Sequence, residues 1–443
     1  MPLCAPPSTA AIEEGTNGTA RSNSVSIAGD ALPKPTKTSA SGGKATPGEG
    51  ALAGLKIVDL TRVLSGPFAT QILADHGADV IKLEPPAGDE VRDWGPPFHE
   101  GSASYFIGIN RNKRSVGIDL TKTGGHEVLF RLLEGADVLI ENFKPGQLDT
   151  WGIGYEQVLK ERFPRLVYAK ISGFGSDGPL GGFPGYDAIV QAMAGWFSIN
   201  GEPAGGPTRI GLPMVDIGTG LYTLIGILMA LYERERSGRG QYLDMTLYDC
   251  ALSLMFPHFP NYFLSGKVPG LTGNGHPNLV PYDKFKTGTG EIFLGAGNNR
   301  QFATLMELMG AGEIATDARF KTNGDRLENR TELRAIIEAK LANVDGNAFC
   351  ETMLKAGVPC GPVLNSETAL AHPHTKHRRM VVEKDWYKGT GTPIKFSRTP
   401  GRLKSAPPKF SEHARSVLSE HGFDEAAIEK LAAAGVVVEK RRG

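Results

Sequence analysis

The sequence predicts an α/β fold in which a parallel β-sheet carries helices on both faces. The main observation is an alternation of short apolar segments, typical of buried strands, with longer segments that carry helical signals. Expected strands span residues 55–60, 79–83, 115–120, 137–140 and 166–171, and expected helices span 67–76 and 126–133. A second observation is the glycine content, 57 of 443 residues, which indicates many tight turns or close backbone approaches. The alternation is typical of strand–helix–strand units and therefore of a parallel sheet.

The first strand–helix–strand unit begins at Leu55. Residues 55–60 are short and mostly apolar, as expected of a strand. Pro67 suits the first position of a helix, because its missing N–H would have no partner there in any case. Gly77 is a natural stop for that helix, and residues 79–83 then form the next strand.

The remaining elements follow in order along the chain. Residues 220–236 predict an apolar helix with a charged end, followed by a strand at 241–246. Residues 266–280 are rich in Gly, Asn and Pro and are typical of a linker. Beyond them we expect a strand at 291–295, helices at 301–309 and 331–341, an irregular segment at 366–403, and amphipathic helices at 412–421 and 424–434.

Residues 1–50 differ in composition from the rest of the chain. About two-thirds are Ala, Gly, Ser, Thr or Pro, and the first aromatic residue is Phe68. Such a segment buries too little apolar surface to offset its ordering entropy, which predicts a disordered tail. It lacks the apolar stretch of a secretory signal, and Arg21 as its only arginine, with Glu13 and Glu14, makes it a poor mitochondrial presequence. We therefore expect a cytoplasmic protein, with a mitochondrial location as the alternative.

Composition excludes several classes of partner. The 48 Lys+Arg residues balance the 48 Asp+Glu residues, which argues against nucleic-acid binding. Only four cysteines occur, with no CxxC, which argues against a disulfide framework or a thiolate zinc site and fits a reducing compartment. The longest mostly apolar run, 221–231, is too short to span a bilayer, so we expect no membrane partner.

Several standard motifs are missing from the sequence. It contains no Walker A, HExxH or GxSxG pattern. Residues 173–178 spell GxGxxG, but Pro179 and Pro184 follow, so no helix begins there to bind a pyrophosphate. We interpret this segment as a plain loop.

Two aspartates stand where helices are expected to begin. Asp216 follows an apolar stretch and precedes Gly218 and Gly220, where backbone N–H groups and the helix dipole would keep a carboxylate ionised. Such a carboxylate is either a nucleophile toward a carbonyl group or an ordinary helix N-cap. Asp187 follows Gly185-Tyr186 and most simply caps the next helix.

A third candidate segment ends the expected strand at 137–140. Open parallel sheets bind ligands beyond the carboxyl ends of their strands. There Asn142 offers hydrogen bonds, Phe143 offers a stacking face, and Lys144 offers a charge for a phosphate group. The alternative is an ordinary strand-to-helix turn.

Eight segments in a fixed order make the chain recognisable. They are Val58-Asp59-Leu60-Thr61 with Gly66-Pro67; 77–84; 112–115; 137–143; Gly185-Tyr186-Asp187; Val215-Asp216; 237–241; and 357–363. With these segments, residues 51–438 resemble the class III CoA-transferase family, which includes formyl-CoA transferase and carnitine CoA-transferase.

The resemblance implies a mechanism that needs no metal. Asp216 matches the family's nucleophile, which attacks the thioester of an acyl-CoA to form a mixed anhydride and then an aspartyl-CoA thioester. An ordinary aspartate, with a pKa of about 3.9, is already ionised at neutral pH and needs no general base. Backbone N–H groups must stabilise the oxyanions; we look for them at the glycines beside Asp216 and in the loop Val63-Leu64-Ser65.

The resemblance also implies that coenzyme A is bound as the acyl-CoA substrate. The implied contacts are Arg62, Val63, Leu64, Leu120, Asn142 and Phe143, with Lys144 added on electrostatic grounds. The family often has His and Gln where this chain has Arg62 and Leu64, and often a basic residue where it has Pro85. These departures affect the expected phosphate contacts.

The implied architecture is an interlocked homodimer. A large Rossmann-like domain with the parallel sheet is expected at 51–250, completed by about 375–443. A linker at 251–270, a smaller α+β domain at 271–365 and a return segment at 366–443 make up the rest.

The acyl donor is predicted only by class. The glycine-run loop of formyl-CoA transferase is missing, which speaks against oxalate and formyl-CoA as the natural pair. Residues 273–277 and 297–301 are more similar to relatives that use succinyl-CoA and a small dicarboxylate. Arg209, Lys284 and Arg300 are candidate partners for the second carboxylate.

The main alternative is a 2-methylacyl-CoA racemase of the same family. Racemases need two bases, and their histidine stands where this chain has Tyr186, a poor base at neutral pH. In a transferase, Tyr186 and Asp187 are helpers: Asp187 forms a hydrogen bond near the thioester or orients Tyr186. Asp187 is also the alternative nucleophile if Asp216 does not have that role. A non-catalytic CoA-binding subunit and an acyl-CoA hydrolase are the remaining alternatives.

Overall fold

The computed structural model describes residues 50–441, all within one compact unit that spans 45–443. The tail predicted at 1–50 lies outside the described residues except for Gly50.

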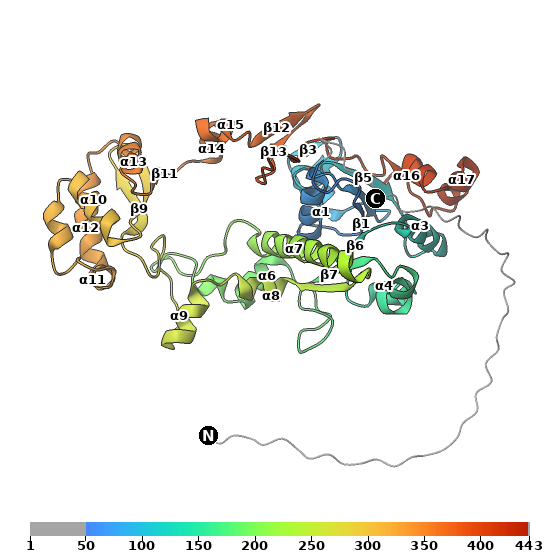
Figure 1. Cartoon of the computed structure of the whole chain (residues 1–443), viewed down its shortest axis with the longest axis horizontal. Helices are drawn as coiled ribbons and strands as arrows, with labels where there is room; N and C mark the ends of the chain where they lie inside the picture. The colour runs from blue at the N-terminus through green and yellow to red at the C-terminus, as the bar shows by residue number, and fades with distance from the viewer. Residues whose placement is uncertain (1–49, 442–443) are drawn as a thin grey trace, which may run out of the picture. The chain divides into compact units, whose positions relative to one another are not determined.

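A six-stranded sheet forms the framework of one part of the fold, on the right in Figure 1. Its order is β5-β2-β1-β6-β7-β8, and all five strand pairs are parallel. The strands are β1 (Lys56–Asp59), β2 (Asp79–Glu84), β5 (Lys113–Gly117), β6 (Val138–Glu141), β7 (Val167–Ser172) and β8 (Tyr242–Thr246). The predicted parallel α/β fold is therefore confirmed.

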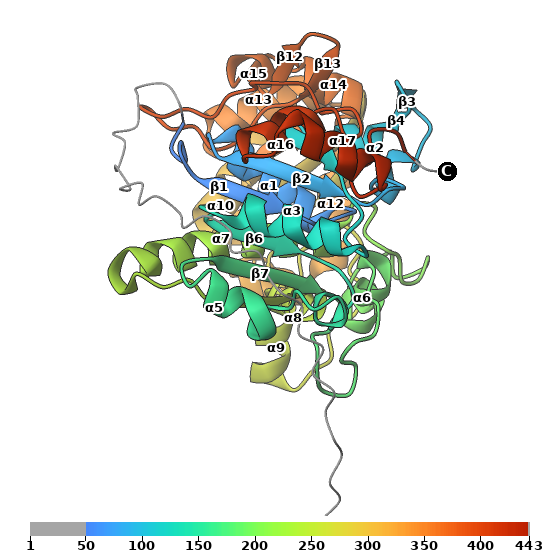
Figure 2. The same ribbon diagram turned by 90° about the vertical axis from the view of Figure 1, so that its right-hand side faces the viewer.

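Helices cover both faces of this sheet, because successive strand residues point to opposite sides. Val58 packs in one apolar cluster and Ile57 in another. The cluster of Val58 includes side chains of α3 (Thr123–Leu133), α16 (Ala414–Glu420) and α17 (Glu425–Ala433), which lie in front of the sheet in Figure 2. The cluster of Ile57 includes side chains of α1 (Ser65–Asp75), α6 (Asp187–Met193), α7 (Met214–Ser237) and α8 (Leu247–Ser253).

Helix α7 begins six residues earlier than the sequence predicted, so Asp216 lies in its first turn. A β-carbon added at Gly220 would lie 2.5 Å from the carbonyl oxygen of Ser65, which shows how closely α7 packs on α1. Among residues 50–441, α7 is the one helix long and apolar enough to cross a membrane by length and composition alone. Val215, Leu224 and Ile227 on its buried side belong to the core between α1 and the sheet.

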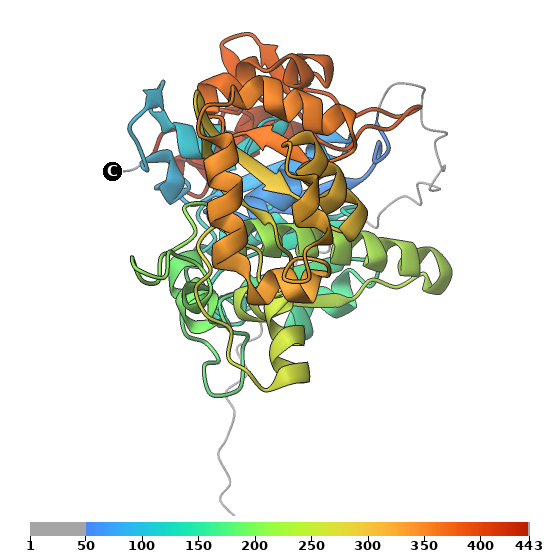
Figure 3. The same cartoon turned by 90° about the vertical axis from the view of Figure 1, so that its left-hand side faces the viewer.

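A second, antiparallel sheet has the order β11-β10-β9. It consists of β9 (Tyr282–Thr287), β10 (Gly290–Gly295) and β11 (Cys360–Pro362). Together with α10 (Asn299–Leu308), α12 (Arg330–Leu341) and α13 (Gly346–Lys355) it forms a separate apolar cluster around Ile292 and Leu305. Figure 3 shows these elements in gold to orange. The strand predicted at 291–295 and the two predicted helices are present.

The segment expected to be irregular, 366–403, contains regular structure, so this expectation was wrong. It holds α14 (Ser366–Ala371), α15 (Pro373–His377) and the hairpin β12 (Val381–Lys384) with β13 (Tyr387–Thr390). Local turn chemistry produces these short elements: Asn365 caps α14, and Asp385 takes a left-handed φ of 53° in the hairpin turn.

Short elements complete the chain. They are η1 (Glu90–Arg92), β3 (Phe98–His99), β4 (Ser102–Ala103), α2 (Ser104–Ile107), α4 (Gln147–Thr150), η2 (Tyr155–Leu159), α5 (Lys160–Arg162), η3 (Trp196–Ser198), α9 (His258–Ser265), η4 (Gly312–Thr316) and α11 (Asn323–Glu328).

Candidate active site

A cavity of about 350 Å³ lies beyond the carboxyl ends of β1, β6 and β7, where open parallel sheets bind ligands. Eight of the predicted site residues line it: Arg62, Val63, Leu64, Asn142, Phe143, Lys144, Tyr186 and Asp216. Its lining does not include Leu120 or Asp187, both of which are buried. The fold therefore brings segments from four distant parts of the chain to one place.

Asp216 is half-buried at this cavity, and within residues 50–441 its carboxylate accepts one hydrogen bond from the protein. The hydroxyl of Ser65 donates a hydrogen bond of 2.6 Å to Asp216 Oδ1. Burial raises the pKa of Asp216 to about 6; the Ser65 hydrogen bond lowers it and the nearby charge of Asp187 raises it further. The ordinary value assumed from the sequence is thus too low, yet most of the carboxylate is still ionised at pH 7.

Close packing of two helices makes this contact possible. Ser65 is the first residue of α1, and Asp216 lies in the first turn of α7. Gly220 allows the approach, since any side chain there would meet the Ser65 backbone. A β-carbon at Gly218 would likewise lie 2.4 Å from the side chain of Leu254. Both glycines lie within α7, where their small size serves packing.

The loop before α1 has backbone donors without partners. Within residues 50–441, the N–H groups of Leu64 and Ser65 donate to no protein acceptor. Both residues are buried and line the cavity. They are therefore available as donors to an oxygen atom beside Asp216, as an oxyanion requires.

Asp187 supports the start of α7 and does not face the cavity. Its Oδ1 accepts the backbone N–H of Val215 at 2.8 Å and that of Asp216 at 3.3 Å. Its Oδ2 accepts the side-chain amide of Gln191 at 2.6 Å. The carboxylate thus caps α7 across space instead of the helix that it begins, and its three hydrogen-bond donors within residues 50–441 belong to Val215, Asp216 and Gln191. Tyr186 itself lines the cavity and is 55% exposed.

Asn142 is engaged by the protein backbone. Its side-chain NH₂ donates to the carbonyl of Arg62 at 2.8 Å, and its oxygen accepts the Arg62 N–H at 2.9 Å. The side chain that sequence reasoning assigned to CoA therefore anchors the loop after β1. The guanidinium of Arg62 lies 5.6 Å from the ring centroid of Phe143, and its Nε has no partner among the described residues.

Two cations line the cavity, Arg62 and Lys144. The residues proposed from the sequence for a second carboxylate, Arg209, Lys284 and Arg300, do not line it. Lys284 instead forms an ion pair of 3.0 Å with Glu291. Within residues 50–441, no group of three or more His, Cys, Asp or Glu side chains is placed to hold a metal ion.

Sequence reasoning missed the hydroxyl of Ser65, which it considered only as a backbone donor. Nothing in the local sequence identifies this side chain, because its contact depends on packing between helices 151 residues apart. The small residue at Gly220 was the available signal, since a glycine within an apolar helix often marks a close approach of another backbone.

Known proteins match most of the chain. Residues 52–414 match the model of CoA-transferase family III. A succinate–glutarate CoA-transferase of Agrobacterium fabrum is 42% identical over 83% of this chain and 95% of its own. An acetyl-CoA:oxalate CoA-transferase of Acetobacter aceti is 39% identical over 85% of this chain and 97% of its own. The crystal structure of a CAIB/BAIF family protein from Brucella suis, 43% identical, superimposes with a TM-score of 0.76 over 84% of this chain and 100% of its own.

Proposed function

The chain belongs to CoA-transferase family III, and from this premise we propose that it moves CoA from a dicarboxylic acyl-CoA, such as succinyl-CoA, to a small carboxylic acid by way of Asp216. The observation that carries the proposal is a half-buried carboxylate at the cavity, oriented by Ser65. The names of the two relatives support the substrate class, because glutarate and oxalate are both dicarboxylates. Oxalate therefore belongs among the acceptors to test, although the sequence argued against it.

The proposed reaction passes through two kinds of aspartyl intermediate. The Asp216 carboxylate attacks the thioester carbonyl; a C–O bond forms, the C–S bond breaks, and CoA leaves as a thiolate. The thiolate then attacks the Asp216 carbonyl of the anhydride, which releases the first acid and leaves an aspartyl-CoA thioester. The acceptor carboxylate and the thiolate repeat these two steps in reverse, so that a new acyl-CoA leaves and Asp216 is restored. No net proton transfer or redox change is required.

The chain's own groups assist these steps in different ways. The Ser65 hydroxyl occupies Oδ1 of Asp216 and leaves Oδ2 to attack. The free N–H groups of Leu64 and Ser65 stabilise the negative oxygen of each tetrahedral intermediate. Arg62 and Lys144 supply positive charge for the phosphates of CoA or for the second carboxylate.

The racemase alternative lacks suitable bases at Tyr186 and Asp187, the two positions at which the resemblance implies them. Asp187 accepts two backbone N–H groups and an amide, so both of its oxygens are occupied. Tyr186 is a phenol, which is a poor proton acceptor at neutral pH. Glu90 is a second carboxylate in the lining of the cavity. Neither Tyr186 nor Asp187 offers a free base, however, and a carboxylate oriented by Ser65 fits nucleophilic transfer better than two-base proton exchange.

A homodimer is part of the proposal. One side of α7 exposes six large apolar side chains to solvent: Leu221, Tyr222, Ile225, Leu228, Met229 and Tyr232. Their spacing places them along one stripe of the helix, and an apolar stripe of this length is typical of a protein interface. The occupant that we propose is a second copy of this chain, interlocked as the family resemblance implies. Sedimentation equilibrium tests it: a monomer at micromolar concentration would refute the dimer.

The function is tested by trapping the covalent intermediate. The full-length protein is incubated with succinyl-CoA, treated with hydroxylamine or borohydride, and analysed by peptide mass spectrometry. We expect one modified residue, Asp216, and no modification in Asp216→Ala. Asp249→Ala is the matched control, because Asp249 also lies in the first turn of a helix but does not line the cavity. A panel of acids including glutarate and oxalate then identifies the acceptor.

Two results would overturn the proposal. One is modification at a residue other than Asp216. The other is the absence of any adduct with all donors tested, together with exchange of the α-proton of a 2-methylacyl-CoA, which would establish the racemase instead.

A further inference from the structure

Val63 has an unusual backbone conformation for its residue type. Its φ is +68°, in the left-handed region that a β-branched side chain rarely occupies. Leu64 and Ser65, which follow it, present the free N–H groups and the hydroxyl beside Asp216. A relaxed conformation at Val63 would move these groups, so the surrounding structure must hold the strained one.

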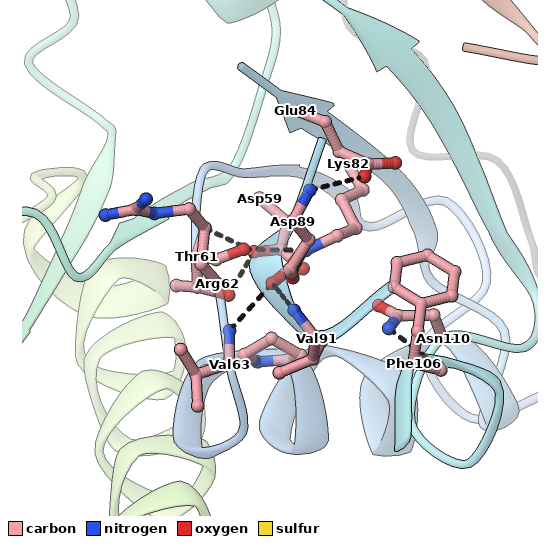
Figure 4. A network of polar contacts seen from close by, with 12 residues as sticks. Asp59, Thr61, Arg62, Val63, Lys82, Glu84, Asp89, Val91, Phe106 and Asn110 are labelled. Carbon is pink, nitrogen blue, oxygen red and sulfur yellow. Dashed lines mark hydrogen bonds and ion pairs between the residues drawn. The ribbon is translucent and has the colours of Figure 1, made fainter. Parts of the chain in front are cut away.

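Asp89 holds the backbone of Val63 directly (Figure 4). Its Oδ1 accepts the N–H of Val63 at 3.2 Å and the N–H of Val91 at 3.3 Å. Its Oδ2 lies 2.9 Å from Nζ of Lys82, and both charged side chains are fully buried. A buried, paired carboxylate is a rigid acceptor, because neither water nor another rotamer can replace its partners.

Lys82 completes the hold on the loop. Its Nζ also donates to the carbonyl of Thr61 at 2.7 Å. Burial alone would lower the pKa of Lys82, but the carboxylates of Asp89 and Asp59 outweigh it and raise that pKa, so the ammonium stays charged. Asn142 holds Arg62 through two further hydrogen bonds. The consecutive loop residues Thr61, Arg62 and Val63 are thus each held by the side chain of a different residue.

Asp89 is itself fixed from β2. Its backbone N–H donates to Glu84 Oε2 at 3.0 Å, and Glu84 pairs with Arg92 at 2.7 Å through both nitrogens Nε and Nη2. Arg92 ends η1, the short turn that Asp89 caps. The acceptor of the Val63 N–H therefore cannot shift without disrupting a second buried ion pair.

We propose that Asp89 is a positioning residue for the transfer reaction: with Lys82 it keeps Val63 in the left-handed conformation and so sets Ser65 against Asp216. The proposal rests on the proposed function, since the effect of losing Asp89 is measured through the reactivity and ionisation of Asp216, the proposed nucleophile. It differs from a purely structural role, in which loss of Asp89 lowers stability but leaves the folded active site unchanged.

The test is a double-mutant cycle of Asp89→Asn and Val63→Gly, with kcat and the pH dependence of kcat/KM measured per folded enzyme. Asp89→Asn keeps an oxygen that can accept the Val63 N–H but loses the ion pair with Lys82 that fixes its position, and we expect it to lower kcat by about tenfold to a hundredfold. It also moves the acid limb of the profile to higher pH, because Asp216 loses the Ser65 hydrogen bond. In the Val63→Gly background the effect of Asp89→Asn on kcat is at least about threefold smaller, because glycine adopts positive φ without strain.

Asp75→Asn is the matched control. Asp75 is equally buried and forms an ion pair of 2.6 Å with Arg111, but it lies at the opposite end of α1 from Ser65. We expect it to lower the melting temperature and to leave the acid limb in place. If Asp89→Asn does not fold, Asp89→Glu serves, since it keeps a charge for Lys82 but displaces the acceptor from Val63.

The outcomes separate the two proposals. A folded Asp89 variant with the wild-type kcat and acid limb overturns the positioning role while CoA transfer by the wild type stands. Equal effects of Asp89→Asn in the two backgrounds overturn the role assigned to Val63. A wild-type protein that transfers no CoA overturns the proposed function itself.

Discussion

Replacing Ser65 by alanine removes the hydrogen bond that its hydroxyl donates to Asp216, and the size of the effect follows from the geometry of that bond. The bond is 2.6 Å long and is made to a half-buried carboxylate. Hydrogen bonds to charged groups contribute about 1.5 to 3 kcal/mol, and partial exposure favours the lower end. At about 1.4 kcal/mol per pKa unit, the pKa of Asp216 rises by about one unit from its present value of about 6.

This shift has a distinct signature in the pH profile. At pH 7 the ionised fraction of Asp216 falls from about nine-tenths to about one-half, so kcat/KM falls about twofold from ionisation alone. Loss of orientation lowers kcat about a further threefold to tenfold at every pH. The assay is the initial rate of CoA transfer from succinyl-CoA between pH 5 and 9. An acid limb that stays at the wild-type pH in Ser65→Ala would refute the reasoning, because the hydrogen bond would then not act on the ionised carboxylate.

Three further predictions concern the groups that build the site. Asn142→Ala frees the loop backbone at Arg62, and we expect the KM for acyl-CoA to rise about tenfold with a smaller loss in kcat, measured by steady-state kinetics. Gly220→Ala forces α7 away from α1 and lowers both activity and the melting temperature, whereas Gly211→Ala, with open space around its β-carbon, changes neither. Glu84 has its pKa lowered to about 2 because Arg92 and Lys82 outweigh the effect of burial. Since the folded pKa lies below the unfolded value of 4.5, the stability that the Glu84 carboxylate contributes is complete above about pH 4.5 and is lost as the pH falls toward 2. We therefore expect the free energy of unfolding, measured with urea, to fall less steeply over that pH range in Glu84→Gln than in the wild type.

The parallel sheet could be predicted because its strands obey simple local rules. Residues 55–60 and 79–83 enclose β1 and nearly all of β2, and α1 starts two residues before the predicted helix. The strand predicted at 115–120 was displaced: β5 runs from Lys113 to Gly117. Lys113 is charged and fell outside the predicted strand, yet its side chain is fully buried, with Asp59 at 3.3 Å. Ile118, by contrast, leaves the parallel ladder and pairs with Val437.

Strand β9 was missed because few of its side chains are buried. It is an edge strand with polar residues at four of its six positions, and Phe285 is its only fully buried residue. Hydrophobic periodicity is weakest in such a strand. Its register comes from pairing with β10, which a local reading of the sequence does not contain.

For the candidate site, the sequence likewise predicted some features and missed others. Most of the residues expected at the site line the cavity, and several of them directly follow a strand. The partners of those residues were not: Asn142 was expected to face CoA, and it holds the backbone of Arg62. Asp187 was expected to cap its own helix, and it caps α7. These contacts join residues 80 and 28 positions apart, and only the packed fold determines them.

The return of the C-terminal helices to the first sheet has a consequence for how the chain is made. Helices α16 and α17 cover the same face of the sheet as α3, and the backbone of Ser411 is held by the hydroxyl of Ser115, 296 residues earlier. During synthesis the part of that apolar face that α16 and α17 cover therefore stays exposed until residues 414–433 have left the ribosome. Contacts of such long sequence separation slow folding and prolong the exposure of aggregation-prone apolar surface. A chain that stopped before Ala414 would retain every residue of the candidate active site, yet it would be a client for chaperones and proteases instead of an enzyme.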